Sequence, residues 1–314
     1  MLASYYSKIE IRVLMAIATM LIAFLFAVSA ARGATHKPAE LTVIDETNSV
    51  WKTQSADGQG AFAAFKWGLE GDIRVPADYD GDGITDIAVW RPATGNWHIL
   101  RTSDGATLNI KWKQTGAIGD IPVPADFDGD NIADLAVWRP ENGTWYVLTS
   151  RSGFSGSSVS ALGSLGDIPV PADYDGDGRA DAAVFRSAQN RWYIAESKTG
   201  KLITRDFGLA GTDLLVPADY TGDGRADLAV FRSGVWYVQE LSGETERFEF
   251  GFADSIPVPA DYDGDGTTDF AFYRQGTWYF LDSGQPRLRS VKFGNKNEIP
   301  QTSLSVKPSM IAVR

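Results

Sequence analysis

The chain has 314 residues, of which 44% are hydrophobic and 12% aromatic, so it can bury a substantial core. It has no cysteine and only two histidines, His36 and His98. This composition excludes disulfide bonds and thiolate metal sites and leaves little material for histidine catalysis or a zinc site. The formal net charge is −11 and no basic stripe is present, so nucleic acid is not expected as a partner.

Residues 1–30 have the features of a secretory signal peptide. Lys8 and Arg12 precede an apolar run over residues 13–28, and Val28, Ser29 and Ala30 provide small residues for cleavage. An apolar run of this length is short for a membrane span, which favours a cleaved signal peptide. An uncleaved N-terminal membrane anchor is the alternative. We expect residues 31–40 to be a linker. The mature protein should be secreted, periplasmic or at the cell surface, with no membrane span after cleavage.

An acidic stretch is the unit that repeats along the rest of the chain. Its third copy, residues 166–186, reads GDIPVPADYDGDGRADAAVFR, and the five copies begin near Gly71, Gly119, Gly166, Gly211 and Gly251. The spacing of the copies lies within the period of propeller blades. Each unit also carries four short strand signals separated by turn residues, and nothing after residue 40 has a helical period.

The four strand signals are an Ile-Pro-Val-Pro segment, an alternating segment that ends in arginine, a Trp-Tyr segment, and an apolar segment that ends in an aromatic residue and glycine. The prolines in the first segment, such as Pro122 and Pro124, are two positions apart, so their missing donors point to the same side. Such a strand can pair on one side only. It should be an edge strand, and in a propeller the innermost one along the central channel.

The ends of the chain predict how the propeller closes. Residues 41–51 align without a gap with residues 135–145, so the N-terminus enters the repeat partway through a unit. Near the C-terminus, Glu298, Ile299 and Pro300 begin a sixth first strand without acidic ligands. Residues 311–314 also resemble a second strand and compete with residues 41–44 for that position. Joining the two ends removes the free sheet edges.

We therefore predict an all-β protein, a propeller of six four-stranded blades over residues 41–314. The six third strands are marked by Trp51, Trp97, Trp145, Trp192, Trp236 and Trp278.

Each of the five acidic stretches contains a nine-residue loop. It has carboxylates at positions 1, 3, 5 and 9 and a backbone carbonyl at position 7, which matches how Ca²⁺ collects oxygen ligands. No bidentate glutamate follows at position 12 and no helix pattern flanks the loop, so it is not an EF-hand. The predicted ligands, including the position 7 carbonyls, are Asp78, Asp80, Asp82, Ile84, Asp86; Asp126, Asp128, Asp130, Ile132, Asp134; Asp173, Asp175, Asp177, Arg179, Asp181; Asp219, Asp223, Arg225, Asp227; and Asp261, Asp263, Asp265, Thr267, Asp269.

Two loops depart from the pattern. Asn131 replaces the position 6 glycine of the second loop, and asparagine tolerates the left-handed conformation that this position needs. In the fourth loop Thr221 replaces the position 3 aspartate and removes one charge. We expect about five calcium sites, of which the Asp219 loop is the weakest, with a role in stabilising the fold.

The repeats resemble FG-GAP (or VCBS-type) repeats, which form the N-terminal β-propeller of integrin α-subunits and carry calcium loops of the form D-x-D/N-x-D/N-G-x-x-D. Phe207-Gly208 and Phe250-Gly251 stand for the Phe-Gly of that family, and Pro-Val-Pro-Ala-Asp stands where the family has Gly-Ala-Pro. The resemblance covers about residues 41–314, with shorter units, six blades where integrins have seven, and a sixth blade without its loop. It implies an extracellular propeller used for adhesion or ligand binding.

Aromatic and arginine residues also recur once per blade. Tryptophans of the Trp-Tyr pairs should form the core between blades rather than platforms for sugars. The arginines that end the second strands are Arg91, Arg139, Arg186, Arg232 and Arg274. We expect each to form a bridge to a carboxylate such as Asp120 rather than to contact acidic glycans.

Three functions fit these observations. The favoured one is a non-catalytic calcium-binding module for adhesion or ligand binding, expected to be a monomer that recognises an extracellular glycan or protein. The alternative is a carbohydrate-active enzyme similar to a polysaccharide lyase, and a scaffold for surface assembly is the third. An enzyme needs unique titratable groups in one asymmetric pocket. Nearly every acidic or aromatic residue belongs to the repeat, and exceptions such as His98 are single, so no catalytic residue is predicted.

Overall fold

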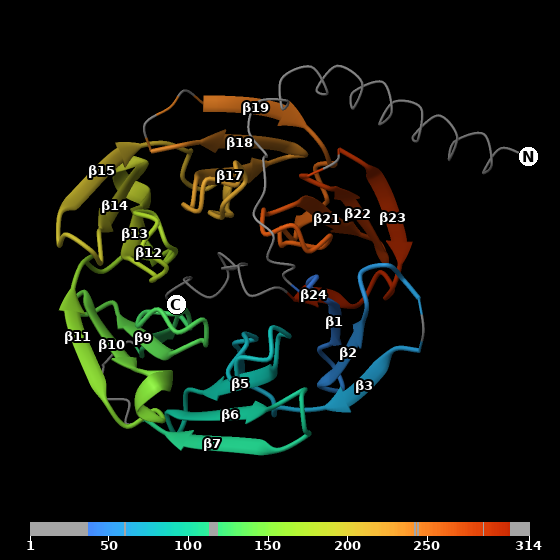
Figure 1. Ribbon diagram of the computed structural model, residues 1–314, viewed down its shortest axis with the longest axis horizontal. Coiled ribbons are helices and arrows are strands. Elements are labelled where there is room, and N and C mark those ends of the chain that lie inside the picture. Colours follow the sequence, from blue (N-terminus) through green and yellow to red (C-terminus); the bar gives the residue numbers. More distant parts are fainter. Residues whose placement is uncertain are drawn as a thin grey trace, which may run out of the picture.

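A computed structural model describes residues 37–301, apart from residues 60, 113–118, 242, 244 and 285. Its strands form six four-stranded antiparallel sheets arranged around a common centre, which confirms the predicted propeller (Figure 1). The predicted signal peptide lies outside the described residues. Within the described part, no helix has the length and apolar character needed to cross a membrane.

The blades follow one another along the chain, and the sixth combines both ends. The first three consist of β4 Ile73–Arg74, β5 Ile87–Arg91, β6 Asn96–Leu100 and β7 Thr107–Lys111; β8 Ile121–Pro122, β9 Leu135–Arg139, β10 Thr144–Leu148 and β11 Ser157–Ala161; and β12 Asp167–Pro169, β13 Ala182–Arg186, β14 Arg191–Ala195 and β15 Leu202–Asp206. The last three consist of β16 Leu214–Leu215, β17 Leu228–Arg232, β18 Val235–Gln239 and β19 Thr245–Glu249; β20 Ile256–Pro257, β21 Phe270–Arg274, β22 Thr277–Leu281 and β23 Leu288–Lys292; and β24 Ile299–Gln301, β1 Leu41–Asp45, β2 Val50–Gln54 and β3 Ala63–Lys66. Two 3₁₀ turns, η1 Ser150–Ser152 and η2 Ser187–Gln189, lie in connections.

The proline-bearing first strands are edge strands, as predicted. Each pairs only with the second strand of its blade, for example Pro122 opposite Val137, and is two or three residues long. They lie toward the centre of the ring, where β12 and β24 are seen in Figure 1. The missing proline donors therefore face the channel and not another strand.

The sixth blade closes the ring by pairing the two ends of the chain. β1 pairs antiparallel with β24, with Val43 opposite Pro300, and the blue and red strands lie side by side in Figure 1. Leu41–Asp45 therefore occupies the second-strand position, while the competing residues 311–314 lie outside the described part. Closure pairs what would otherwise be the two free ends of the array.

The tryptophans of the third strands form the core, as predicted. All six are at most 1% exposed: Trp51, Trp97, Trp145, Trp192, Trp236 and Trp278. Most indole N–H groups donate to the carbonyl of the residue that follows the fourth strand of the same blade, as Trp192 Nε1 does to Phe207 O at 3.1 Å. The tryptophan of the third strand thus contacts the aromatic-glycine pair that follows the fourth strand, and this contact gives the buried indole N–H a hydrogen-bond acceptor.

The recurring arginines form structural bridges, which also confirms the prediction. Arg139 donates Nε and Nη2 to the two oxygens of Asp120 at 2.7 and 2.9 Å, and its guanidinium stacks on Tyr146. Arg91, Arg186 and Arg232 make the same two-point contact with Asp72, Asp167 and Asp213. In the fifth blade Arg274 instead makes a single bond to the exposed Asp254 and stacks on Phe252.

Candidate functional site

The five acidic loops connect the first and second strands of the first five blades. In each loop an isolated bridge extends the strand pairing, for example between Ala77 and Asp86. The position 2 tyrosine adds a second anchor in four loops, as when Tyr174 Oη donates to Val170 O at 2.8 Å. Each loop is therefore fixed at both ends by its own blade.

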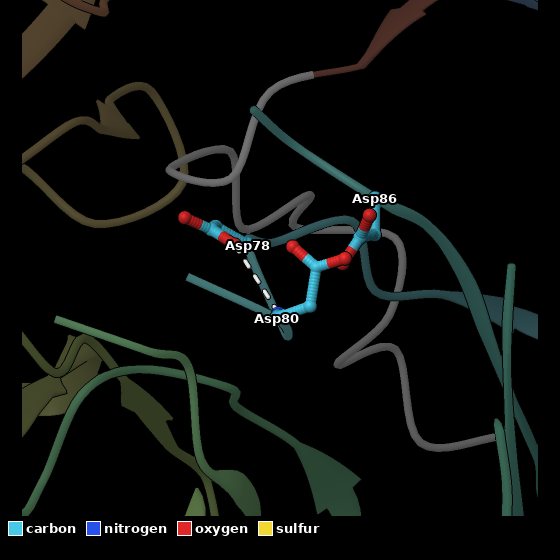
Figure 2. Close-up of side chains that lie close together, drawn as sticks. All are labelled: Asp78, Asp80 and Asp86. Carbon is cyan, nitrogen blue, oxygen red and sulfur yellow. Dashed lines mark hydrogen bonds between the residues drawn. The ribbon is translucent and has the colours of Figure 1, made fainter. Parts of the chain in front are cut away.

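The first aspartate of each loop shapes the turn. Asp78 Oδ1 accepts from Gly81 N at 2.7 Å and Oδ2 from Gly83 N at 2.8 Å. Gly83 has φ +81°, and Asn131 at the same position of the second loop has φ +65°, so the predicted tolerance of asparagine is confirmed. Figure 2 shows Asp78, Asp80 and Asp86 gathered by this turn.

The aspartates at position 9 are the most buried acidic groups of the loops. Asp86, Asp134, Asp181, Asp227 and Asp269 are at most 2% exposed. Burial raises the pKa of Asp86, Asp134 and Asp181 to about 6 and that of Asp227 and Asp269 to about 7. Their oxygens accept backbone bonds, as Asp181 does from Tyr174 N in its loop and from Ser197 N after the third strand. Asp86, Asp134 and Asp269 make the same pair of bonds, so in four loops this carboxylate joins the loop to the blade, whereas Asp227 accepts from Tyr220 N and Thr221 N of its own loop.

Four of the five loops bring three carboxylates close enough to share one ion, with ligand atoms within 4.8 Å of one another. The groups are Asp78, Asp80, Asp86; Asp126, Asp128, Asp134; Asp173, Asp175, Asp181; and Asp261, Asp263, Asp265. Positions 1, 3 and 9 form the first three groups, and positions 1, 3 and 5 form the last. The fourth loop, with Thr221 at position 3, gives no such group within the described part of the chain.

Unpaired oxygens at position 3 show that the second and third loops fit a cation. Asp175 is 8% exposed, and its buried Oδ1 has no hydrogen-bond partner among the described residues. Both oxygens of Asp128 are likewise buried without a hydrogen bond, although Arg151 Nη2 lies 3.8 Å from Oδ1. Burial also raises the pKa of Asp175, and Asp177 and Asp173 raise it further. A buried carboxylate oxygen without a donor is costly unless a cation pairs with it.

Backbone hydrogen bonds join neighbouring loops. The position 8 N–H of one loop donates to the position 1 carbonyl of the preceding loop, as Ala180 N does to Asp126 O at 2.6 Å. The equivalent bonds join Ala133 to Asp78, Ala226 to Asp173, and Thr268 to Asp219. The loops are therefore linked around the propeller, a relation that sequence spacing alone did not indicate.

The described part of the predicted linker, residues 37–40, continues this chain of contacts. Ala39 N donates to Asp261 O at 2.7 Å, in the place that a position 8 residue takes elsewhere. The gapless alignment of the N-terminal unit puts Glu40 at position 9. Burial of Glu40 raises the pKa of its carboxyl group, and the nearby negative charge of Asp82 raises it further. Lys37 Nζ donates to Asp82 O of the first loop. Residues 37–40 thus supply the second half of a sixth loop that carries a lysine.

A cavity of about 430 Å³ lies between the third and fourth blades, away from the acidic loops along the strands. We call it the inter-blade cavity and define it by its lining residues Asn190, Asp206, Phe207, Gly208, Leu209, Val230, Arg232, Tyr237 and Thr245. None of these lining residues is among the site residues predicted from the sequence. Two departures from the repeat could have pointed to this cavity in the sequence, one at Asn190 and one in the connection after Phe207.

Comparison with known proteins agrees with the fold. The FG-GAP-like repeat family matches residues 78–137, 126–184 and 173–230. No match was found among curated proteins.

Solved structures give similarity in fold at low identity. A lectin of Agrocybe aegerita, described as recognising non-reducing terminal N-acetylglucosamine, is 16% identical with a TM-score of 0.54, over 82% of this chain and 76% of that one. BBS1N in complex with ARL6DN is 12% identical with a TM-score of 0.51, over 85% and 89%. An inactive virginiamycin B lyase from Staphylococcus aureus is 8% identical with a TM-score of 0.50, over 83% and 86%. These likenesses concern the fold alone. Together with the matched repeats, the six closed blades identify the chain as an FG-GAP repeat β-propeller.

Proposed function

We propose that this protein is a secreted or periplasmic calcium-binding propeller that binds a glycan or protein ligand without catalysis. The observation that carries the calcium assignment is the buried, unpaired Oδ1 of Asp175, which belongs to a three-carboxylate group. Hard oxygen ligands at this spacing suit Ca²⁺ better than a softer metal. When bound, the ion supplies positive charge that pairs with the buried carboxylates. Asp173, Asp175 and Asp181 would hold it in the third loop.

The positions of the titratable groups support a binding role rather than an enzymatic one. The aspartates with the most strongly raised pKa values belong to the repeated loops, where burial and backbone bonds account for them. In the inter-blade cavity the charged groups are already engaged, since Asp206 pairs with Arg191 and Arg232 with Asp213. An enzyme would need an acid or base free to exchange protons at its site.

The ligand and the location are part of the proposal. A lectin is among the proteins that share the fold, so a glycan is a suitable first ligand class to test. The signal-like features of residues 1–30 support export.

The test is retention of the full chain on an array of glycans and cell-surface polysaccharides, in calcium and in EGTA, with the products checked by mass. Calcium-dependent retention without cleavage is the expected result. Cleaved products would overturn the non-catalytic assignment, and retention of protein partners alone would replace glycan with protein as the ligand. Cell fractionation with N-terminal sequencing tests export, and a cytoplasmic, unprocessed chain would contradict it.

A further inference from the structure

We propose that the inter-blade cavity between the third and fourth blades is a binding site for a neutral saccharide. This inference rests on the proposed binding function and assigns a place and a ligand class to it. A feature present in every blade serves the blade, whereas a departure from the repeat at one position needs another explanation.

Two departures coincide at this cavity. The first is Asn190, which occupies the turn position where four other blades have Gly95, Gly143, Gly234 and Gly276 and the sixth has Ser49. Between the second and third blades the equivalent position is closed, because a Cβ added to Gly143 would lie 2.1 Å from Gly163 O. Asn190 carries a whole side chain at that position, with φ +50°, so the turn and the facing connection cannot approach as closely.

The second departure is the length of the facing connection. After the aromatic-glycine pair, Leu69 N donates to Asp72 and Ser164 N to Asp167, three residues on in each case. At the cavity Leu209 N donates to Asp213, four residues on. Asn190 Oδ1 accepts from Ala210 N at 2.7 Å and so holds the longer connection in place. The connection between the first and second blades contains residues 113–118, outside the described part.

The lining matches the chemistry of a sugar. Leu209, which is 47% exposed, provides apolar surface for the C–H face of a ring, and the buried Phe207 and Val230 lie beneath it in the lining. Planar polar groups stand beside this surface. No hydrogen bond is made by Nδ2 of Asn190 to another described residue, and Nη1 of Arg232 lies outside its two-point contact with Asp213. A site with an apolar wall and a few placed polar groups is typical of small-molecule recognition, and about 430 Å³ is within the usual size.

The charge of the lining favours a neutral ligand. Arg232 is offset by Asp213, at 2.5 Å, and stacks on Tyr237 at 4.6 Å. Asp206 is offset by Arg191, whose hydrogen bonds lower the Asp206 pKa and keep the carboxylate ionised. A charged ligand would find no charge in the lining that is not already neutralised by an ion pair. The hydroxyl groups of a neutral sugar can still form hydrogen bonds with Arg232 and Asp206 while these two residues keep their ion pairs.

The test measures binding of the full chain to immobilised neutral oligosaccharides (chitobiose, cellobiose and maltose series) and to oligogalacturonate as the acidic comparison. Leu209→Ser and Asn190→Gly alter the cavity, and glycine suits the left-handed turn that Asn190 occupies. Leu69→Ser is the matched control, because Leu69 follows the Trp67-Gly68 pair as Leu209 follows Phe207-Gly208, and it is 62% exposed.

We expect retention on a neutral series, weakened by about tenfold in both cavity variants and by less than about twofold in the control. Retention that is equal in all variants would overturn this site and leave the proposed binding function standing. Retention on oligogalacturonate alone would overturn the neutral ligand class. Retention of peptides with no saccharide would overturn this site and the glycan part of the proposed function together. Thermal unfolding of each variant identifies any loss that comes from misfolding.

Discussion

Lys52 and Glu298 join the two ends of the propeller across the closing blade. Lys52 Nζ lies 2.5 Å from Glu298 Oε1, and Glu298 is only 5% exposed. In the other blades an arginine at the end of the second strand bonds the acidic residue that opens the unit. The sixth blade has Asp45 at that position, and Lys52 bonds the acid from the third strand instead.

Lys52→Met should therefore weaken closure. It leaves a buried carboxylate without its cation, which costs about 3 kcal/mol of the free energy of unfolding. Urea denaturation measures the loss, and Lys52→Met with Glu298→Gln should recover most of it. Arg247→Met breaks the exposed Arg247–Glu249 pair and is the control, with no measurable loss expected. Equal losses in the two single variants would contradict the closing role.

Calcium removal should lower the melting temperature of the folded protein. An ion that binds only the native state stabilises it by about 2.7 kcal/mol per site at a hundred times its dissociation constant. Melting curves in excess Ca²⁺ and in EGTA check this, and identical curves would argue against structural calcium.

Asp175→Ala should damage one calcium site and leave the others. The control Asp57→Ala, at an exposed position outside the loops, should leave the number of bound calcium ions unchanged.

Calcium should also reverse the pH dependence of stability. Without the ion, burial raises the pKa of Asp181 from 3.8 to about 6 and that of Asp269 to about 7. Between the unfolded pKa of 3.8 and these folded pKa values, the folded state binds more protons than the unfolded state. The free energy of unfolding therefore falls as the pH rises from about 4 to 8. With Ca²⁺ bound the carboxylates are held ionised and stability falls as the pH is lowered. Melting temperatures from pH 5 to 8 should diverge between EGTA and Ca²⁺, and parallel curves would count against bound calcium.

The fourth loop should gain affinity from one substitution. Thr221→Asp restores the position 3 carboxylate that the other loops have, beside Asp219 and Asp227. A competitive chelator titration should show the weakest site moving toward the others. Thr107→Asp adds the same charge on the outer strand β7 and should leave that titration unchanged. A site that does not tighten would mean that the missing carboxylate is not what makes this loop different.

Much of the fold could be predicted because its determinants are local. The period of the acidic stretch, the paired prolines and the six tryptophans each depend on spacing within one unit, and spacing within a unit is written in the sequence. The loop aspartates were found in the same way, since positions 1, 3 and 9 of one turn are brought together by that turn itself. Even the tolerance of Asn131 follows from a single backbone conformation.

Only the tertiary structure decided how the units meet. The bond from Ala39 to Asp261 and the pair of Lys52 with Glu298 join residues more than 200 positions apart, and no repeat spacing specifies them. The same holds for the inter-blade cavity. Asn190 and the longer connection after Phe207 are small irregularities in the sequence, and they become a site because two neighbouring blades place them against each other. Contacts within a blade follow from the repeat, whereas contacts between blades depend on where each blade departs from it.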